Sequence, residues 1–237
     1  MIRDLDTEIP FITMNPDNIQ KYNINPVNSN YIFLFDIDDT LYKASEEMHN
    51  LEMEKWYSAY KHFKLEVPCA LDFNTLLDSK PLYSEAFYYH FNKTPYEVEK
   101  VKGFLDYSKF VKRNEDLKLC LKNIKHRKWC FTNGMKCRAE PILKCLDLLD
   151  TFEGVICMDN KCPSNLVLGK PYKQVYYFVE ELLKIQDKSK VYFFDDSIVN
   201  INIGKKMGWN SFLIEKKDNI INVLNDVMDK IADEMER

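Results

Sequence analysis

Five short apolar runs recur along the chain, and they constrain its fold more than any other feature. The runs occupy residues 31–35, 128–132, 154–158, 191–194 and 211–214, and they are rich in aromatic and β-branched side chains. Runs of this length and composition are typical of buried strands. Helical patterns lie between them, so strand and helix alternate. This alternation predicts an α/β fold in which helices cover both faces of a parallel sheet.

Two of the helices can be predicted from the spacing of their apolar residues. In the segment 171–184, apolar side chains recur at i, i+3, i+4 and i+7, beginning at Val175. Pro171 is well placed as the first residue of this helix. Ile142, Leu146 and Leu149 have a similar spacing and predict a helix before the third run.

One long segment interrupts the alternation of strands and helices. Residues 43–118 contain no convincing strand, whereas Trp56, Tyr60 and Phe63 are spaced as one face of a helix. We therefore predict an all-helical cap at 43–118, inserted into a core domain of 31–42 and 119–237. An insertion at this point lies over the carboxyl ends of the strands, where α/β proteins bind ligands. Residues 1–30, rich in Asn and Pro, are expected to form an N-terminal arm that is extended over the surface or partly disordered.

The composition narrows the class of protein and its partners. The formal net charge is −4, with 46% hydrophobic and 30% charged residues, which is ordinary for a soluble globular chain and unlike a nucleic-acid-binding domain. The seven cysteines include no C-x-x-C pair and no zinc-ligand spacing, which favours a reducing cytoplasmic location, with the nucleus left open. We expect no secretory signal, because the first residues include Arg3, Asp4 and Asp6 and no apolar stretch. We expect no membrane-spanning helix, because no apolar run approaches the roughly 18 residues that such a helix needs. The oligomeric state is not predicted.

Two carboxylates at the end of the first predicted strand are the strongest chemical signal. Asp36 and Asp38 are two residues apart, in the stretch DIDDTL, and can point into one site. Their mutual repulsion is relieved by a bound cation, and Mg²⁺ accepts a few carboxylates while keeping positions for water and phosphate oxygens. One carboxylate can then attack phosphorus, while the other serves as general acid and base. The alternative interpretation is an acidic turn that caps the following helix.

Three weaker motifs follow the other predicted strands or open a helix. Thr132, Asn133 and Gly134 can form a tight turn whose hydroxyl and backbone N–H groups hold phosphate oxygens. Lys170 stands at the predicted start of a helix, where its charge can neutralise a phosphate. Asp195 and Asp196 end the fourth run, where two adjacent acids call for a cation. Taken singly, these motifs also fit a strand-to-helix turn, a solvated lysine and a helix cap.

Together the four motifs resemble those of the haloacid dehalogenase-like phosphohydrolase superfamily. They occur in the family's order across residues 31–214, and the sheet of that family has the strand order 5-4-1-2-3. The chain is most similar to the fungal-type pyrimidine 5′-nucleotidase branch, on the stretches FLFDIDDTLY (33–42), FTNG (131–134), GKP (169–171) and FFDDSIVNINIGKKMGW (193–209). A helical cap after the first motif also matches that branch.

The resemblance implies a role for each matching residue. Asp36 would be the nucleophile that forms an aspartyl-phosphate, and Asp38 the acid and base. The phosphate would be held by Thr132, Asn133 and Lys170, with Lys170 balancing charge. The Mg²⁺ ligands would be Asp36, the backbone carbonyl of Asp38, and Asp196, with Asp195 as an alternative or supporting ligand. Asn200 falls where many relatives carry another acid and would lie behind the ligands, and Asp39 replaces a glycine that is common in the family.

The reaction that these residues favour is hydrolysis of a small phosphomonoester. Family dehalogenases lack an acid two residues after the nucleophile, so Asp38 argues against dehalogenation, and the long cap argues against a protein substrate. The resemblance points to a pyrimidine nucleoside 5′-monophosphate, UMP or CMP. Lysophosphatidic acid, sugar phosphates, a mutase reaction and a catalytically silent binding protein remain alternatives. A cap aromatic can stack on a base, or it can belong to the cap's own core. The candidates are Trp56, Tyr57, Tyr83, Tyr88 and Tyr89.

Overall fold

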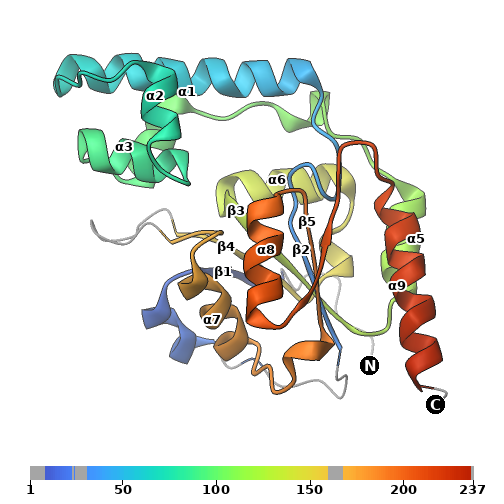
Figure 1. The fold of residues 1–237 in the computed structure, drawn as a ribbon. Helices are drawn as coiled ribbons and strands as arrows, with labels where there is room; N and C mark the ends of the chain where they lie inside the picture. The colour runs from blue at the N-terminus through green and yellow to red at the C-terminus, as the bar shows by residue number, and fades with distance from the viewer. Residues whose placement is uncertain (1–8, 23, 25–30, 160–167, 236–237) are drawn as a thin grey trace.

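A computed structural model of the chain describes residues 9–22, 24, 31–159 and 168–235. Within these residues, six strands form one parallel sheet: β1 (Phe11–Thr13), β2 (Ile32–Phe35), β3 (Arg127–Met135), β4 (Gly154–Met158), β5 (Val191–Asp195) and β6 (Asn210–Leu213). The sheet order is β1-β4-β3-β2-β5-β6. Strands β2 to β6 are the five predicted runs, and they have the predicted order 5-4-1-2-3. The predicted α/β fold with a Rossmann-like sheet is thus confirmed (Figure 1).

Helices cover both faces of this sheet. One face packs on α5 (Glu115–Asn123), α6 (Lys136–Leu146) and α9 (Ile220–Met235), and the other on α7 (Lys173–Leu182) and α8 (Ile198–Met207). Successive residues of β2 enter opposite cores, because side chains alternate along a strand: Phe33 and Phe35 face the first layer, and Leu34 faces the second. Both faces are therefore dry, which explains why the strand sequences are continuously apolar.

The long segment without strands is a separate helical layer. It contains α1 (Glu46–Glu66), α2 (Phe73–Asp78), α3 (Tyr83–Phe91) and α4 (Pro95–Lys102), and none of residues 43–118, all of which are described, lies in a strand. Tyr60, Phe63, Phe87 and Phe91 form the centre of its own core, on the predicted helix faces. Figure 1 shows this helical insertion beyond the carboxyl ends of the strands. The described residues also include short 3-10 helices: η1 (Pro16–Lys21), η2 (Tyr107–Lys109), η3 (Leu149–Thr151) and η4 (Lys188–Lys190).

The N-terminal segment contains a strand that the sequence analysis did not predict. β1 pairs with β4 in parallel, from Phe11 opposite Val155 to Thr13 opposite Cys157, and extends the sheet at its edge. Ile12 and Met14 are buried in the core, so this part of the predicted arm is held by apolar contacts as well as by the strand pairing. Residues 1–8, 23 and 25–30 of the predicted arm lie outside the described residues.

Three local predictions were wrong. Helix α7 begins at Lys173, with Tyr172 as its N-cap, so Pro171 and Lys170 precede the helix; the Lys170–Pro171 peptide bond is cis. Helix α6 ends at Leu146, because Asp147 adopts the left-handed conformation (φ 56°), and Leu149 lies in η3. Residues 132–134 form no tight turn: β3 continues through an irregularity in its pairing with β4 to Met135.

No helix among the described residues has both the length and the apolar character that crossing a membrane requires.

Candidate active site

Two acids meet at the carboxyl edge of the sheet because their strands are neighbours. Asp36 directly follows β2, and Asp195 is the last residue of β5, which pairs with β2. The backbone N–H of Asp36 donates to the carbonyl of Phe194 at 2.9 Å, so strand pairing continues up to the site. Asp36 is 7% exposed and Asp195 is fully buried. Two buried carboxylates this close require a compensating cation.

Lys170 is that cation. Its ammonium lies 2.7 Å from Asp36 Oδ1 and 2.7 Å from Asp195 Oδ2, and it also donates to the carbonyl of Phe131 at 2.6 Å. The side chain is 1% exposed. Burial acts to lower the pKa of Lys170, but the two carboxylates outweigh it and raise that pKa, so the charge is retained.

Asn133 holds Lys170 in this position. The side-chain oxygen of Asn133 accepts from the backbone N–H of Lys170 at 2.7 Å, and its amide nitrogen donates to the Lys170 carbonyl at 2.9 Å. Gly169 allows this close approach, since a Cβ atom there would lie 2.9 Å from the Asn133 oxygen. Thr132 is buried, and its hydroxyl oxygen accepts from the N–H of Gly134 at 2.9 Å, which leaves the hydroxyl hydrogen to donate.

The electrostatics of the acidic side of the site favour a further cation. Burial raises the pKa of Asp36 well above its usual range, with Asp195 and Asp38 adding to the effect and Lys170 opposing it. The exposed Asp196 has a pKa raised to about 6, through partial desolvation and the charges of Asp195 and Asp39. Raised carboxyl pKa values of this kind mean that burial and neighbouring carboxylates disfavour the ionised forms, and a bound cation would offset both effects.

The donor atoms at this edge fit Mg²⁺ better than a softer metal. Among the described residues, no three His, Cys, Asp or Glu side chains gather into a ready-made metal cluster. Mg²⁺ does not need one, since it takes one or two carboxylates and keeps several waters. Asn200 supports the acidic side by donating from its amide to both oxygens of Asp195, at 2.9 and 3.2 Å.

Asp39 lies in a conformation that favours glycine. Its φ is 54°, in the left-handed region, where Asp and Asn are tolerated better than most side chains. Its carboxylate accepts from the backbone N–H of Ala44 at 2.9 Å, which stabilises the loop that leads to α1. A glycine would satisfy the same backbone geometry without the hydrogen bond.

Asp38 faces the helical insertion and is held by an arginine. Arg138 contacts both of its oxygens, from Nη2 to Oδ1 at 2.9 Å and from Nε to Oδ2 at 3.2 Å, and the Tyr42 hydroxyl donates to Oδ1 at 2.5 Å. Removal from water acts to raise the pKa of Asp38, but Arg138 and Tyr42 outweigh it and lower that pKa. Asp38 is therefore ionised in the resting protein.

Sequence reasoning missed Arg138 and its partners. Arg138 stands in the first turn of α6, six residues after Thr132, and reaches Glu52 on α1 and Tyr107 on η2. These residues are scattered over three elements, and none belongs to a recognisable motif. The available signal was the position of Arg138 in the helix that begins at the carboxyl edge of the sheet.

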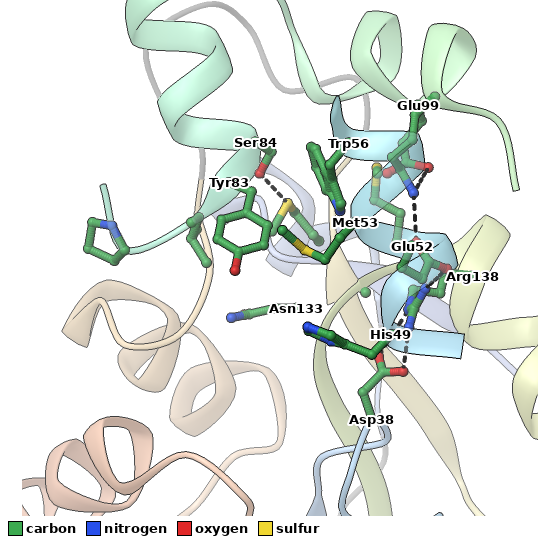
Figure 2. Close-up of a pocket in the computed structure, with 16 residues that line it drawn as sticks. Asp38, His49, Glu52, Met53, Trp56, Tyr83, Ser84, Glu99, Asn133 and Arg138 are labelled. Atoms are coloured by element: carbon green, nitrogen blue, oxygen red, sulfur yellow. Dashed lines mark hydrogen bonds and ion pairs between the residues drawn. The ribbon is translucent and has the colours of Figure 1, made fainter. Parts of the chain in front are cut away.

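A pocket of about 340 Å³ separates the core from the helical insertion. Figure 2 shows Asp38 and Asn133 on its core side, with Trp56, Tyr83 and Met53 facing them from the insertion. Of the aromatic residues predicted as possible base contacts, Trp56 and Tyr83 line this pocket. Tyr57 and Tyr89 are exposed and are not among its lining residues, and neither is Tyr88.

The parallel sheet has an acid after β2 and a buried lysine that joins this acid to β5, which is the arrangement expected from the resemblance of the sequence motifs. The model of the haloacid dehalogenase-like hydrolases matches residues 32–208, more than half of the chain, and the protein belongs to this family. Phosphate metabolism protein 8 of Saccharomyces cerevisiae is 25% identical over 205 residues, which are 78% of this chain and 61% of that protein. The chain thus spans less than two thirds of the length of that relative.

Solved structures support the same fold. A HAD family enzyme from Bacteroides thetaiotaomicron aligns with a TM-score of 0.53 and 15% identity, over 80% of this chain and 95% of that one. A second structure of that enzyme, in complex with magnesium and inorganic phosphate, aligns with a TM-score of 0.51 and 14% identity, over 80% and 96% of the two chains. At these identities the likeness concerns the fold alone.

Proposed function

We propose that this hydrolase is a Mg²⁺-dependent phosphomonoesterase that works through an aspartyl-phosphate on Asp36. The observation that carries the proposal is the buried pair of Asp36 and Lys170, at 2.7 Å, at the strand ends beside Asp38. A buried carboxylate held by a lysine is a suitable nucleophile for an anionic phosphate, because the lysine offsets charge that both bring to the site. The complex of the related Bacteroides enzyme with magnesium and phosphate is consistent with this chemistry.

The proposed reaction consists of two displacements at phosphorus. In the first, an Asp36 oxygen attacks phosphorus, the bond to the leaving oxygen breaks, and Asp38 gives that oxygen a proton. In the second, water attacks phosphorus, the bond to Asp36 breaks, and Asp38 takes the proton from the water. Asp38 is ionised in the resting protein, so it takes up the first of these protons from solvent; in later cycles it gives the leaving group the proton gained in the second step. The free donor hydrogens of Thr132 and Asn133 hold phosphate oxygens, and Lys170, whose three hydrogens go to Asp36, Asp195 and Phe131, acts through its positive charge.

The residues that would hold Mg²⁺ are those at the acidic edge of the sheet. Asp36, the backbone carbonyl of Asp38 and Asp196 would be the ligands, because Asp195 already accepts from Lys170 and Asn200. Asp195 would then orient the site from behind, and Asn200 would orient Asp195. When bound, the ion supplies positive charge that offsets the charge of the transferring phosphoryl group.

We expect Mg²⁺ to raise the unfolding temperature less at pH 5 than at pH 7, at equal Mg²⁺ concentration. Asp196 has a pKa of about 6 in the metal-free protein. Below pH 6 its carboxyl group is protonated, Mg²⁺ must displace that proton, and the apparent affinity falls about tenfold for each pH unit. Thermal-shift titrations with Mg²⁺ at both pH values measure this effect without reference to activity.

Two variants sharpen that measurement. Asp196→Asn should lose most of the Mg²⁺ response, whereas Asp229→Asn, an exposed acid on α9, should keep it. Equal titration midpoints at pH 5 and pH 7, or a full Mg²⁺ response in Asp196→Asn, would contradict the metal assignment.

We further propose that the helical insertion acts as a cap and that the substrate is a pyrimidine nucleoside 5′-monophosphate. The pocket wall opposite Asp38 contains the rings of Trp56 and Tyr83, which can stack on a base. Lys102 and Arg138, the lysine and arginine of the described pocket lining, are both paired with carboxylates. A leaving group without further negative charge suits such a wall better than a second phosphate does.

A second candidate is a lysophosphatidic acid. Four lining residues, Met53, Leu82, Met135 and Met158, give the pocket an apolar side that can also take an acyl chain. Methionine adapts its shape to different ligands, so this wall alone does not choose between a base and a chain.

Substitution of Tyr83 tests the assignment of the leaving group. Tyr83→Ala should raise KM for UMP or CMP by about 10-fold, within the roughly 1–3 kcal/mol of a base–aromatic contact, and change KM for p-nitrophenyl phosphate far less. Tyr89→Ala is the matched control, because Tyr89 lies on the same helix, is 67% exposed and does not line the pocket. The assay panel is UMP, CMP, AMP, GMP, lysophosphatidic acid, sugar phosphates and p-nitrophenyl phosphate, with Mg²⁺ and with EDTA. Preference for lysophosphatidic acid, or equal KM values for UMP in both variants, would overturn the nucleotide assignment.

A further inference from the structure

Arg138 contacts both carboxylate oxygens of Asp38 and so fixes the plane of that carboxylate. The two contacts, at 2.9 and 3.2 Å, run from different guanidinium nitrogens to different carboxylate oxygens. This two-pronged geometry holds both the position and the rotation of the group, whereas a single point charge would fix neither. Asp38 lines the pocket between core and insertion, so its orientation decides which oxygen of a bound ester it can reach.

The third guanidinium nitrogen of Arg138 contacts the helical insertion. Its Nη1 donates to Glu52 Oε1 on α1 at 2.5 Å and to the hydroxyl of Tyr107 at 3.1 Å. Tyr107 in turn donates to the same Glu52 oxygen at 3.1 Å, and Lys102 on α4 lies 3.3 Å from the other one. Glu52, Lys102 and Tyr107 are all buried. Figure 2 shows Arg138 between Glu52 and Asp38, with dashed contacts to both.

We propose that Arg138 is a positioning residue for Asp38, and that Glu52 anchors it, so that the helical insertion sets the geometry of proton transfer in the core. The inference rests on the proposed phosphatase function. Arg138 acts through Asp38, and its effect is confined to the steps in which Asp38 moves a proton. The chemistry at Asp36 and Lys170 does not depend on this contact, because both are held by a separate set of hydrogen bonds.

The test compares two phosphate esters whose leaving groups differ in how strongly their departure depends on protonation. Phenyl phosphate and p-nitrophenyl phosphate are nearly alike in shape, but phenolate is the far poorer leaving group and depends on general-acid help. In the first turnover, Arg138→Met should slow release of phenol by about 10²-fold and release of p-nitrophenol by less than about threefold. Because water activation also uses Asp38, p-nitrophenol should then appear as a burst of one equivalent, followed by slow turnover.

Further variants separate positioning from a structural role. Arg138→Lys keeps the positive charge but cannot contact both carboxylate oxygens from two fixed nitrogens. It should therefore slow the two esters unequally, as Arg138→Met does. Asp38→Asn combined with Arg138→Met should be no slower than Asp38→Asn alone, since one residue acts through the other. Glu52→Gln should show a weaker form of the same pattern. Arg113→Met removes an arginine that pairs with acids on the surface and should leave both rates unchanged.

The outcomes distinguish this inference from the proposed function. If wild-type protein with Mg²⁺ releases nothing from either ester, the phosphatase assignment itself fails. If wild type is active and the two esters slow in parallel in Arg138→Met and Arg138→Lys, or if neither slows, Arg138 does not position Asp38. Full rescue by Arg138→Lys would also overturn the proposal, because charge alone would then suffice.

Discussion

Asp36→Asn should abolish phosphate release, with a loss of about 10⁴-fold or more for every ester that the wild-type protein hydrolyses. The amide keeps the shape of the side chain but cannot form an acyl phosphate. We expect the fold to be retained, because burial already raises the pKa of Asp36 well above its usual range. Ionised Asp36 is thus costly in the metal-free protein, and its neutral replacement should leave the unfolding temperature equal or higher. Steady-state assays and thermal unfolding of the same preparation measure both effects.

Loss of activity together with an unchanged or higher unfolding temperature would separate a chemical role of Asp36 from a structural one. An inactive Asp36→Asn protein with a lower unfolding temperature would indicate a damaged fold. It would also contradict the claim that ionised Asp36 is costly in the metal-free protein. A folded variant with activity near that of the wild type would show that Asp36 is not the nucleophile.

Lys170→Met should lower both stability and activity. The substitution leaves Asp36 and Asp195 buried without their shared cation, which typically costs about 3–5 kcal/mol of unfolding free energy, or on the order of 10 °C for a chain of this size. The stability difference from wild type should narrow as the pH falls from 7 to 5. Without Lys170, nothing opposes the effect of burial on the pKa of Asp36, so at lower pH Asp36 takes up a proton and part of the uncompensated charge disappears.

The activity of Lys170→Met should fall by about 10³-fold, because a fixed positive charge next to the transferring group is lost. Lys188→Met removes a half-exposed lysine that is paired with Glu180; it is the matched control and should change neither property much. A stability difference that stays constant or widens towards pH 5 would contradict the assignment of Lys170 as the cation between two buried acids.

The central sheet could be predicted from the sequence because its strands are buried on both faces. Such strands are continuously apolar and bounded by polar residues, so their positions and those of Asp36 and Asp195 follow from local sequence. β1 could not be predicted, because it is only three residues long, Phe11–Thr13, and lies in a polar segment. Its pairing with β4 is a tertiary contact that leaves little trace in local composition.

The details of the site were harder to predict for the same reason. Helix α7 begins two residues after the predicted first position, Pro171. Proline suits a first helical turn in general, but here it precedes the N-cap Tyr172. Arg138, Glu52 and Tyr107 come together only because α1 and η2 lie over the end of α6's first turn. No sequence spacing predicts such a contact. In the sequence alone, Arg138 and Glu52 resemble ordinary surface charges, and Tyr107 resembles a core aromatic residue.

The most direct test of the central claim is chemical trapping of the phosphorylated enzyme. Wild-type protein is mixed with p-nitrophenyl phosphate and Mg²⁺, quenched in acid during turnover, and treated with borohydride, which reduces an acyl phosphate to an alcohol. Peptide mass spectrometry then locates the reduced residue. We predict reduction at Asp36, dependent on substrate and Mg²⁺ and absent from Asp36→Asn. Reduction at another residue, or turnover with no reducible intermediate under any quench time, would contradict the account.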